Sequence, residues 1–222
     1  MTFSQWTAFI FDHPVAKPEW YWKEDPSWRW PKLDEACITD YLTRLFQRSD
    51  TVLLPFTNAQ LDQGLNLLIS PGSSDYMFAL RDQKVPLAAR LHCLQSMLRL
   101  FADCFAKRCT PHQSHLDAPG RGPLNSVCYM WWDVLPIHGL THHKPEHPDS
   151  AQIDQTCLAV MKDTLALDSL ACRESALHGL GHWKCYYPDF VKTEIDAFLE
   201  RNPGLPVELH TYALAARQGR VQ

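Results

Sequence analysis

The amino-acid sequence predicts an all-α fold. After Pro31, apolar residues recur every three or four positions through most of the chain, which is the periodicity of amphipathic helices. Proline, glycine and first-turn acids mark short turns between the later periodic stretches, so consecutive helices are expected to pack as antiparallel neighbours. A chain of 222 residues can bury a sizeable core. We therefore expect residues 1–222 to form one helical domain of about eight helices.

Residues 1–31 form a Trp-rich N-terminal arm, because they carry five of the eight tryptophans. In PEWYWKEDPSWRWP, Trp20 and Trp22 precede a Lys-Glu-Asp-Pro-Ser turn, and Trp28 and Trp30 follow it. This alternate spacing predicts a short hairpin, or two extended arms with the indoles on one face. We expect the arm to cover the open end of the helical stack; an exposed patch of indoles for a partner is the alternative.

Residues 32–149 are expected to form an irregular helical half. Its longest periodic run has Pro86 at its start and Lys107 and Arg108 in its last turn, as helix ends favour. Thr57 and Gln60 have the spacing of a capping box. Helices are predicted at about 33–48, 57–69 and 86–108, with a short helix within 71–80.

The segment NSVCYMWWDVL, residues 125–135, is apolar nearly all round and predicts a buried central helix. Trp131 and Trp132 are expected in the core, where an indole N–H needs an acceptor. Asp133 is expected either to accept that hydrogen bond or to face solvent. Segments rich in Pro, Gly and polar residues predict loops at 110–124 and 137–149.

Residues 150–222 have the most regular pattern. Very short turns separate four predicted helices, which form two hairpins of roughly 35–38 residues, the size of one solenoid repeat. The helices are predicted at about 150–166, 169–184, 188–201 and 206–218.

The stretch DSLACRESALHGLGHWKCYYPDFVKTEIDAFL resembles a HEAT-type helical repeat. It has an Asp-led turn, an Arg that opens the inner helix, small and aliphatic residues, and a Leu-Gly pair. These positions are Asp168, Arg173, Ala176, Leu177, Leu180 and Gly181. The resemblance covers about a fifth of the chain and implies a right-handed α–α superhelix with a binding surface. LNSVCYMWWDVLP and ACRESALHGLGHW also resemble parts of bacterial proteins of unassigned role, which implies no function.

His178 and His182 lie one turn apart and therefore on one face of the predicted helix. Two histidines at this spacing can ligate a metal, with a third ligand from Cys185 or from the preceding His-rich loop. However, Gly179 stands where an H-E-x-x-H motif has its glutamate. We expect Gly179 and Gly181 to serve close helix packing, and we predict no metal and no other cofactor. A metal site at His178 and His182 is the alternative.

The loop HGLTHHKPEHP carries four histidines in ten residues. Such a loop is a solvated connection, or else a metal-binding tract or a pH-responsive contact, because histidine ligates metals and titrates near neutrality. Binding residues concentrate in long loops. The predicted partner-binding residues are His138, His142, His143, His147, Arg173 and Trp183.

The composition argues against several classes of protein. With 25 acidic and 21 basic residues the net charge is −4, whereas a nucleic-acid binder usually has a basic surplus. No run of about 18 apolar residues predicts a membrane span, and the N-terminus lacks the basic region of a secretory signal. The eight cysteines form no C-x-x-C pair, which favours reduced, buried thiols and a cytoplasmic location.

Nucleophile elbows, Walker loops and dinucleotide-binding glycine motifs are missing from the sequence, so no catalytic residue is predicted. The chain is therefore expected to be a non-catalytic protein-binding module. One concrete hypothesis is a bacterial immunity protein that neutralises a cognate toxin. The alternative is a metal-dependent enzyme that uses His178 and His182.

Overall fold

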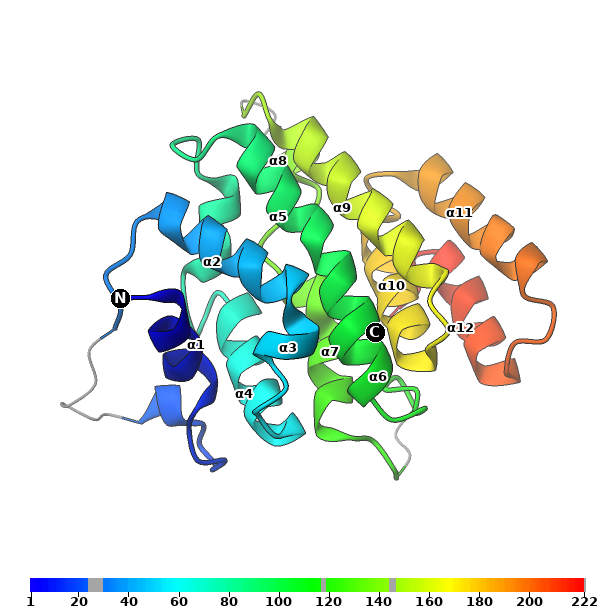
Figure 1. Cartoon of the computed structure of the whole chain (residues 1–222). Coiled ribbons are helices and arrows are strands. Elements are labelled where there is room, and N and C mark those ends of the chain that lie inside the picture. The colour runs from blue at the N-terminus through cyan, green and yellow to red at the C-terminus, as the bar shows by residue number, and fades with distance from the viewer. Residues whose placement is uncertain (24–29, 117–118, 144–146, 222) are drawn as a thin grey trace.

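The protein is all-α, as the sequence predicts, in a computed structural model that describes residues 1–23, 30–116, 119–143 and 147–221 (Figure 1). None of these residues lies in a β-strand. The long helices are α2 (Glu35–Gln47), α4 (Asn58–Ile69), α5 (Leu87–Leu100), α7 (Pro123–Val134), α9 (Ser150–Leu165), α10 (Leu170–Trp183), α11 (Pro188–Arg201) and α12 (Val207–Arg217). Shorter elements are α1 (Phe3–Phe11), α3 (Ser49–Val52), α6 (Ala106–Arg108), α8 (Leu140–His143), the 3₁₀ helices η1 (Trp20–Trp22) and η2 (Tyr76–Arg81), and the π-helix η3 (Phe101–Phe105).

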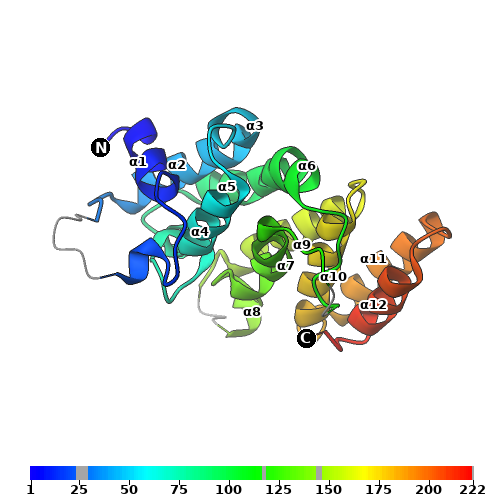
Figure 2. The same cartoon turned by 90° about the horizontal axis from the view of Figure 1, so that it is seen from below.

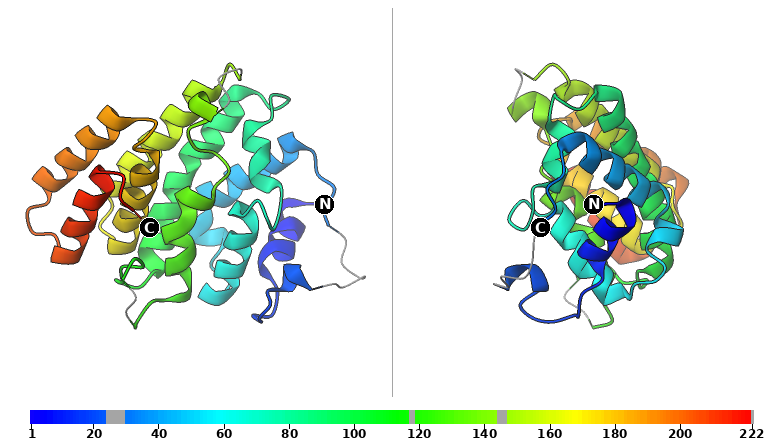
Figure 3. Two further views of the ribbon diagram at one scale, coloured as in Figure 1. Left: turned by 180° about the vertical axis from the view of Figure 1, so that it is seen from behind. Right: turned by 60° about the vertical axis from the view of Figure 1, so that its left-hand side comes forward.

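The helices form two layers (Figures 1 and 2). Helices α2, α5 and α9 lie side by side in one layer, and α4, α7 and α10 lie side by side in the other. Helix α1 packs on α4 at one end, and α11 and α12 pack together at the other, where α12 contacts α10. The view from behind shows that the C-terminus lies near the middle of the molecule, beside α7 and α10 (Figure 3). The α–α superhelix and its right hand stay predictions.

One continuous hydrophobic core contains residues from all three segments distinguished in the sequence, 1–31, 32–149 and 150–222. Its buried residues run from Phe3 in α1 to Ala216 in α12 and form a single cluster of packed side chains. Trp131 and Trp132 of α7 are fully buried within it, as the apolar pattern of that helix predicts. No helix among the described residues is long and apolar enough to cross a bilayer.

Local capping sets several helix starts. Thr57 and Gln60 form the predicted capping box at α4, with each side chain hydrogen-bonded to the other's backbone N–H. The Asp34 carboxylate caps α2 by accepting from the backbone N–H of Cys37 at 2.7 Å. The four helices of the C-terminal segment begin and end within about two residues of their predicted bounds.

The hairpin predicted for the Trp-rich arm is wrong for its described residues. A Thr2–Gln5 capping box starts the α-helix α1, whose Trp6 is buried in the core. Trp20 and Trp22 lie in a 3₁₀ helix, where residues two apart point about 240° apart rather than to one side. Trp20 is accordingly buried and Trp22 exposed. The predicted turn and Trp28 lie outside the described residues.

Three further predictions need correction. The described residues hold twelve α-helical segments instead of about eight, because α1 and the short helices α3, α6 and α8 add to the long ones. Helix α8 interrupts the loop predicted at 137–149. The predicted helix at 86–108 contains a π segment at 101–105, where the Cys172 thiol donates to the carbonyl of Phe101.

Substitution of Gly179 by alanine should destabilise the fold. A Cβ there would lie 2.6 Å from Cβ of Trp132 and 2.7 Å from Sδ of Met161. Overpacking of this kind costs about 1–3 kcal/mol, which exceeds the gain in helix propensity of about 1 kcal/mol. Denaturant titration of Gly179→Ala against the wild type measures the loss. Gly204→Ala is the control, since its Cβ would meet no atom within 4 Å. A Gly179→Ala protein as stable as the wild type would contradict the packing argument.

Candidate metal centre

The contact between α7 and α10 places a row of polar side chains against one another. On α10, Glu174, His178 and His182 follow at intervals of four residues, so they share one face of the helix. Tyr129 and Asp133 have the same spacing on α7. Gly179 faces Trp132, and its missing side chain lets the two helices approach.

Asp133, His178 and His182 bring three metal-ligating atoms together. The Nε2 atoms of the two histidines lie 3.2 Å apart, and Nε2 of His182 lies 3.5 Å from Oδ1 of Asp133. The ligand atoms of all three residues fall within 4.8 Å of one another, and this is the one such cluster among the described residues. His178 is fully buried, whereas the side chains of His182 and Asp133 are 33% and 36% exposed. The cluster therefore opens to solvent on one side.

A tyrosine pair orients the buried histidine. Nδ1 of His178 lies 2.7 Å from the hydroxyl of Tyr212, which lies 2.9 Å from the hydroxyl of Tyr129. The tautomer that leaves the Nε2 lone pair for a metal carries its proton on Nδ1, where the Tyr212 oxygen can accept it. The Tyr129 ring lies 4.1 Å from the His178 ring and limits its rotation. Metal-ligating histidines commonly have such an outer hydrogen bond.

A buried carboxylate anchors the deep end of this network. Glu174 is fully buried and accepts hydrogen bonds from the backbone N–H groups of Ser114 and His115, at 2.7 and 2.9 Å. Nδ1 of His115 lies 2.6 Å from the same carboxylate. The His115 ring stacks on Tyr212 at 4.1 Å. Glu174 thus joins α10 to the loop before α7. It also holds the His115 ring, which packs against one side of Tyr212.

The surroundings keep the buried histidine neutral. Burial, together with the nearby His182 and His115, lowers the pKa of His178 to about 3. Burial also raises the pKa of Tyr129 and Tyr212. At neutral pH these three side chains are therefore uncharged, so protons do not compete for the His178 lone pair.

The spacing of the three ligand atoms fits a first-row divalent metal. Zinc binds imidazole nitrogen and carboxylate oxygen at about 2.0–2.2 Å, so ligands at tetrahedral positions lie about 3.3–3.5 Å apart. The separations of the His182 Nε2 atom from Nε2 of His178 and from Oδ1 of Asp133, 3.2 and 3.5 Å, are close to that value. With a metal bound, Asp133, His178 and His182 would leave a fourth position for the exposed side of the cluster.

The third ligand is not where the sequence predicts it. Asp133 of α7 takes that position, in place of Cys185 or a histidine of the His-rich loop. The Cys185 thiol is exposed and faces the His182 carbonyl, not its ring. Of the two alternatives for Asp133, the bond from an indole does not form, since Nε1 of Trp131 and of Trp132 has no acceptor among the described residues; the Asp133 side chain is partly exposed instead. Gly179 does serve close packing, as predicted.

Sequence reasoning missed Asp133 and the tyrosines because their partners come from other helices. One signal was available: Asp133 is the sole charged residue of α7, at the same four-residue spacing from Tyr129 that separates the two histidines. Nothing in the local pattern of α12 distinguishes Tyr212 from an ordinary core tyrosine.

The histidines of the predicted partner surface do not form one cluster. The His142 ring stacks on Tyr186 at 5.4 Å, and the His138 ring lies 6.2 Å from the same tyrosine. His147 is held elsewhere, with Nδ1 2.9 Å from the side-chain nitrogen of Gln83. The side chain of His143 lies outside the described part of the chain.

The two α10 residues of the predicted partner surface are also apart. Arg173 pairs with Asp168 at 3.7 Å in the first turn of α10. Trp183 is the last residue of the same helix, about 15 Å from Arg173 along the helix axis. Its side chain is fully buried. The expectation of a partner-facing Trp183 is corrected accordingly, because a buried indole has no surface to offer.

No protein-family model, no curated protein and no solved structure matches this chain. The resemblance of residues 168–199 to a HEAT-type repeat therefore stays a prediction. What the centre does is inferred from its own side chains.

The neutral state of His178 should make the fold sensitive to acid. Its pKa is about 3 in the folded protein and 6.5 in the unfolded chain. Between those values the unfolded chain binds a proton that the folded protein does not, so the free energy of unfolding falls as the pH drops. From pH 7 to pH 5 this one group should remove about 2 kcal/mol. Urea titrations at both pH values, with EDTA present, measure the effect.

His178→Gln is the matched variant for this experiment, because glutamine does not titrate in this range. Its loss of stability between the two pH values should be smaller than that of the wild type by about 2 kcal/mol. An equal loss in both proteins would show that His178 titrates in the folded state.

Proposed function

We propose that the chain binds a divalent transition-metal ion, zinc foremost, through His178, His182 and Asp133. The observation that carries the proposal is the spacing of the three ligand atoms: two of the separations approximate the edges of a tetrahedral site, and all three atoms lie within 4.8 Å of one another. The hydrogen bond between Nδ1 of His178 and the Tyr212 hydroxyl supports it, since a proton held on Nδ1 leaves the Nε2 lone pair for a metal.

The arrangement favours a metal with chemistry to perform over a purely structural one. Structural zinc sites usually have four protein ligands, whereas catalytic sites have three and an open position. A metal held in this way acts as a Lewis acid toward a carbonyl or phosphoryl oxygen. Among the chain's residues, Tyr212 orients the buried ligand, and Asp133 supplies the one negative charge of the ligand set. The reaction class that we propose is metal-assisted hydrolysis.

Chelator-treated protein should bind one equivalent of Zn²⁺ or Co²⁺. Asp133→Asn and His182→Ala each remove one partly exposed ligand, so both variants should fold and lose affinity. The loss should exceed the roughly 10- to 100-fold that removal of an outer hydrogen bond causes. Calorimetric titration with Zn²⁺ measures the affinity, and the visible absorption of bound Co²⁺ reports tetrahedral geometry.

His142→Ala is the control, because His142 is an exposed histidine outside the cluster. It should bind metal as the wild type does. Tyr212→Phe should weaken binding about 10- to 100-fold while it keeps one equivalent of metal. Binding of less than about a tenth of an equivalent by the wild type would refute the proposal, since a dedicated site binds tightly. Equal affinity in Asp133→Asn, His182→Ala and the wild type would refute it as well.

The protein-binding function predicted from the sequence stays a second proposal, and one observation favours it. Trp30 is 47% exposed and lines a cavity of about 510 Å³ with Leu33, Ile38 and Tyr76. Exposed indoles beside an apolar hollow are typical anchors of protein interfaces. A cognate toxin is the partner that the immunity hypothesis proposes.

Crosslinking and pull-down of the chain in its native host test this second proposal. We expect a 1:1 complex with one specific protein, and Trp30→Ala should weaken it about 30-fold, as loss of an interface anchor does. Val207→Ala is the control, because Val207 is exposed on α12 at the opposite end of the row. A complex that Trp30→Ala leaves unchanged would argue against this surface.

A further inference from the structure

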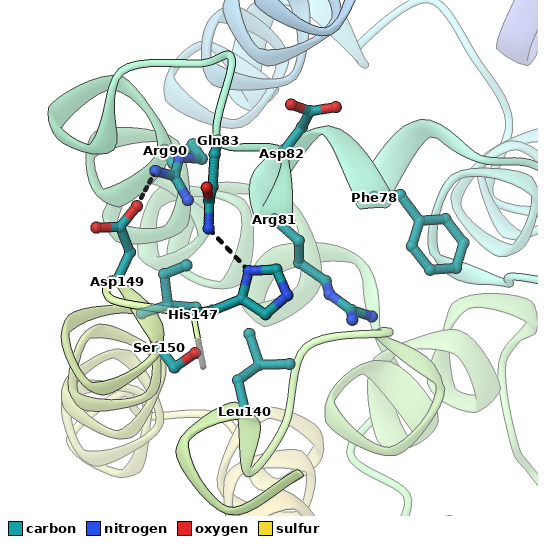
Figure 4. A pocket seen from close by; sticks show the side chains of 10 residues that line it. Phe78, Arg81, Asp82, Gln83, Arg90, Leu140, His147, Asp149 and Ser150 are labelled. Carbon is teal, nitrogen blue, oxygen red and sulfur yellow. Dashed lines mark hydrogen bonds and ion pairs between the residues drawn. The ribbon is translucent and has the colours of Figure 1, made fainter. Parts of the chain in front are cut away.

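A second polar site, none of whose lining residues belongs to the metal-ligand cluster, lies in a cavity of about 200 Å³ between η2 and the start of α9 (Figure 4). Phe78 and Arg81 of η2 form one wall, and Leu140 and Ile153 form an apolar floor. His147 stands in the middle of the view, beside the guanidinium of Arg81.

Arg81 is the feature of this cavity that needs explanation. Its Nη1 donates to the carbonyl of Pro136 at 3.0 Å. Its other N–H groups donate to no described residue, and no described carboxylate forms an ion pair with it. The guanidinium lies 5.6 Å from the Phe78 ring and is partly buried, which lowers the pKa of Arg81 below its ordinary value. A guanidinium has five N–H donors, so most of the donors of Arg81 have no acceptor among the described residues.

The other charged side chains that line the cavity have partners within the chain. Arg90 is buried and pairs with Asp149, and its Nε donates to the carbonyl of Val85 at 2.9 Å. Asp82 accepts from the backbone N–H of Lys84 at 2.8 Å, and its carboxylate points away from Arg81 (Figure 4). Of the two arginines that line the cavity, Arg81 is therefore the one without an ion pair to a described carboxylate.

We propose that this cavity binds a carboxylate attached to a small apolar or aromatic group, with the carboxylate on Arg81. The planar fork of arginine matches a carboxylate with two parallel hydrogen bonds. The apolar body would rest on Phe78, Leu140 and Ile153. The volume suits one ring, since a cavity of about 150 Å³ holds benzene. The carboxylates of Asp82 and Asp149 beside the cavity disfavour a dianion such as phosphate.

The carboxylate has two possible sources: a free small acid, or the C-terminus of a peptide. Both present the same group to Arg81. The site is independent of the proposed metal centre, because none of its lining residues belongs to that cluster. Its test is therefore made with EDTA present, so that failure of one proposal leaves the other standing.

Titration with benzoate, followed by protein NMR, tests the site. Benzoate should bind with resonance shifts at Leu140 and Ile153, and neutral benzamide should bind at least tenfold more weakly. Arg81→Gln should weaken benzoate at least tenfold, because it removes charge-assisted hydrogen bonds. Arg81→Lys keeps the charge but not the fork and should fall between the two. Arg201→Gln is the control, since Arg201 is an exposed arginine on α11.

Peptides that end in a free carboxylate, compared with the same peptides ending in an amide, separate the two sources. Binding of benzoate alone assigns a free acid, and binding of the free-carboxylate peptides assigns a chain terminus; either result supports the site. The proposal is overturned if no carboxylate binds, if benzamide binds as well as benzoate, or if folded Arg81→Gln and Arg81→Lys both bind benzoate as the wild type does. Stronger binding of inorganic phosphate than of benzoate would overturn it too.

Discussion

The close approach of α7 and α10 at Gly179 is the constraint on which this structure depends. A side chain at that position would overlap Trp132 and Met161, so the glycine decides how near the two helices can lie. The same contact joins the N-terminal helices to the C-terminal helices, because α7 also packs on α4 and α10 also packs on α9 and α12. It is also the contact that carries Asp133 to His182.

The polar row between these helices runs from a buried end to an exposed end. At the buried end, Glu174 receives backbone hydrogen bonds that compensate the loss of water around its charge. In the middle, Tyr212 and His178 are neutral and satisfy each other. At the exposed end, His182 and Asp133 reach solvent. A metal ion at that end would meet water on one side and a rigid, pre-oriented imidazole on the other, and such pre-orientation favours both binding and chemistry.

The two proposed sites use different solutions to the burial of polar groups. In the metal-ligand row, the buried polar groups of Glu174, His178 and Tyr212 have partners within the chain, and three ligand atoms lie within 4.8 Å of one another at its exposed end. In the Figure 4 cavity, Arg90 is satisfied by Asp149 and by a carbonyl, whereas Arg81 retains most of its donors. A partly buried guanidinium without a countercharge is costly unless water or a ligand completes it. The first site is therefore defined by three neighbouring metal-ligand atoms, and the second by N–H groups of Arg81 that have no described acceptor.

The sequence by itself determined the helical class, the bounds of the four C-terminal helices, the capping box at Thr57 and the burial of Trp131 and Trp132. These depend on periodicity, capping and hydrophobicity, which act within one helix and are legible in one stretch of chain. It also placed His178 and His182 on one face. Only the tertiary structure decided that Asp133 joins them and that Arg81 lies in a cavity where no described carboxylate pairs with it. Each of these facts is set by how separate elements pack, and the distance between two packed helices is a property of neither sequence segment alone.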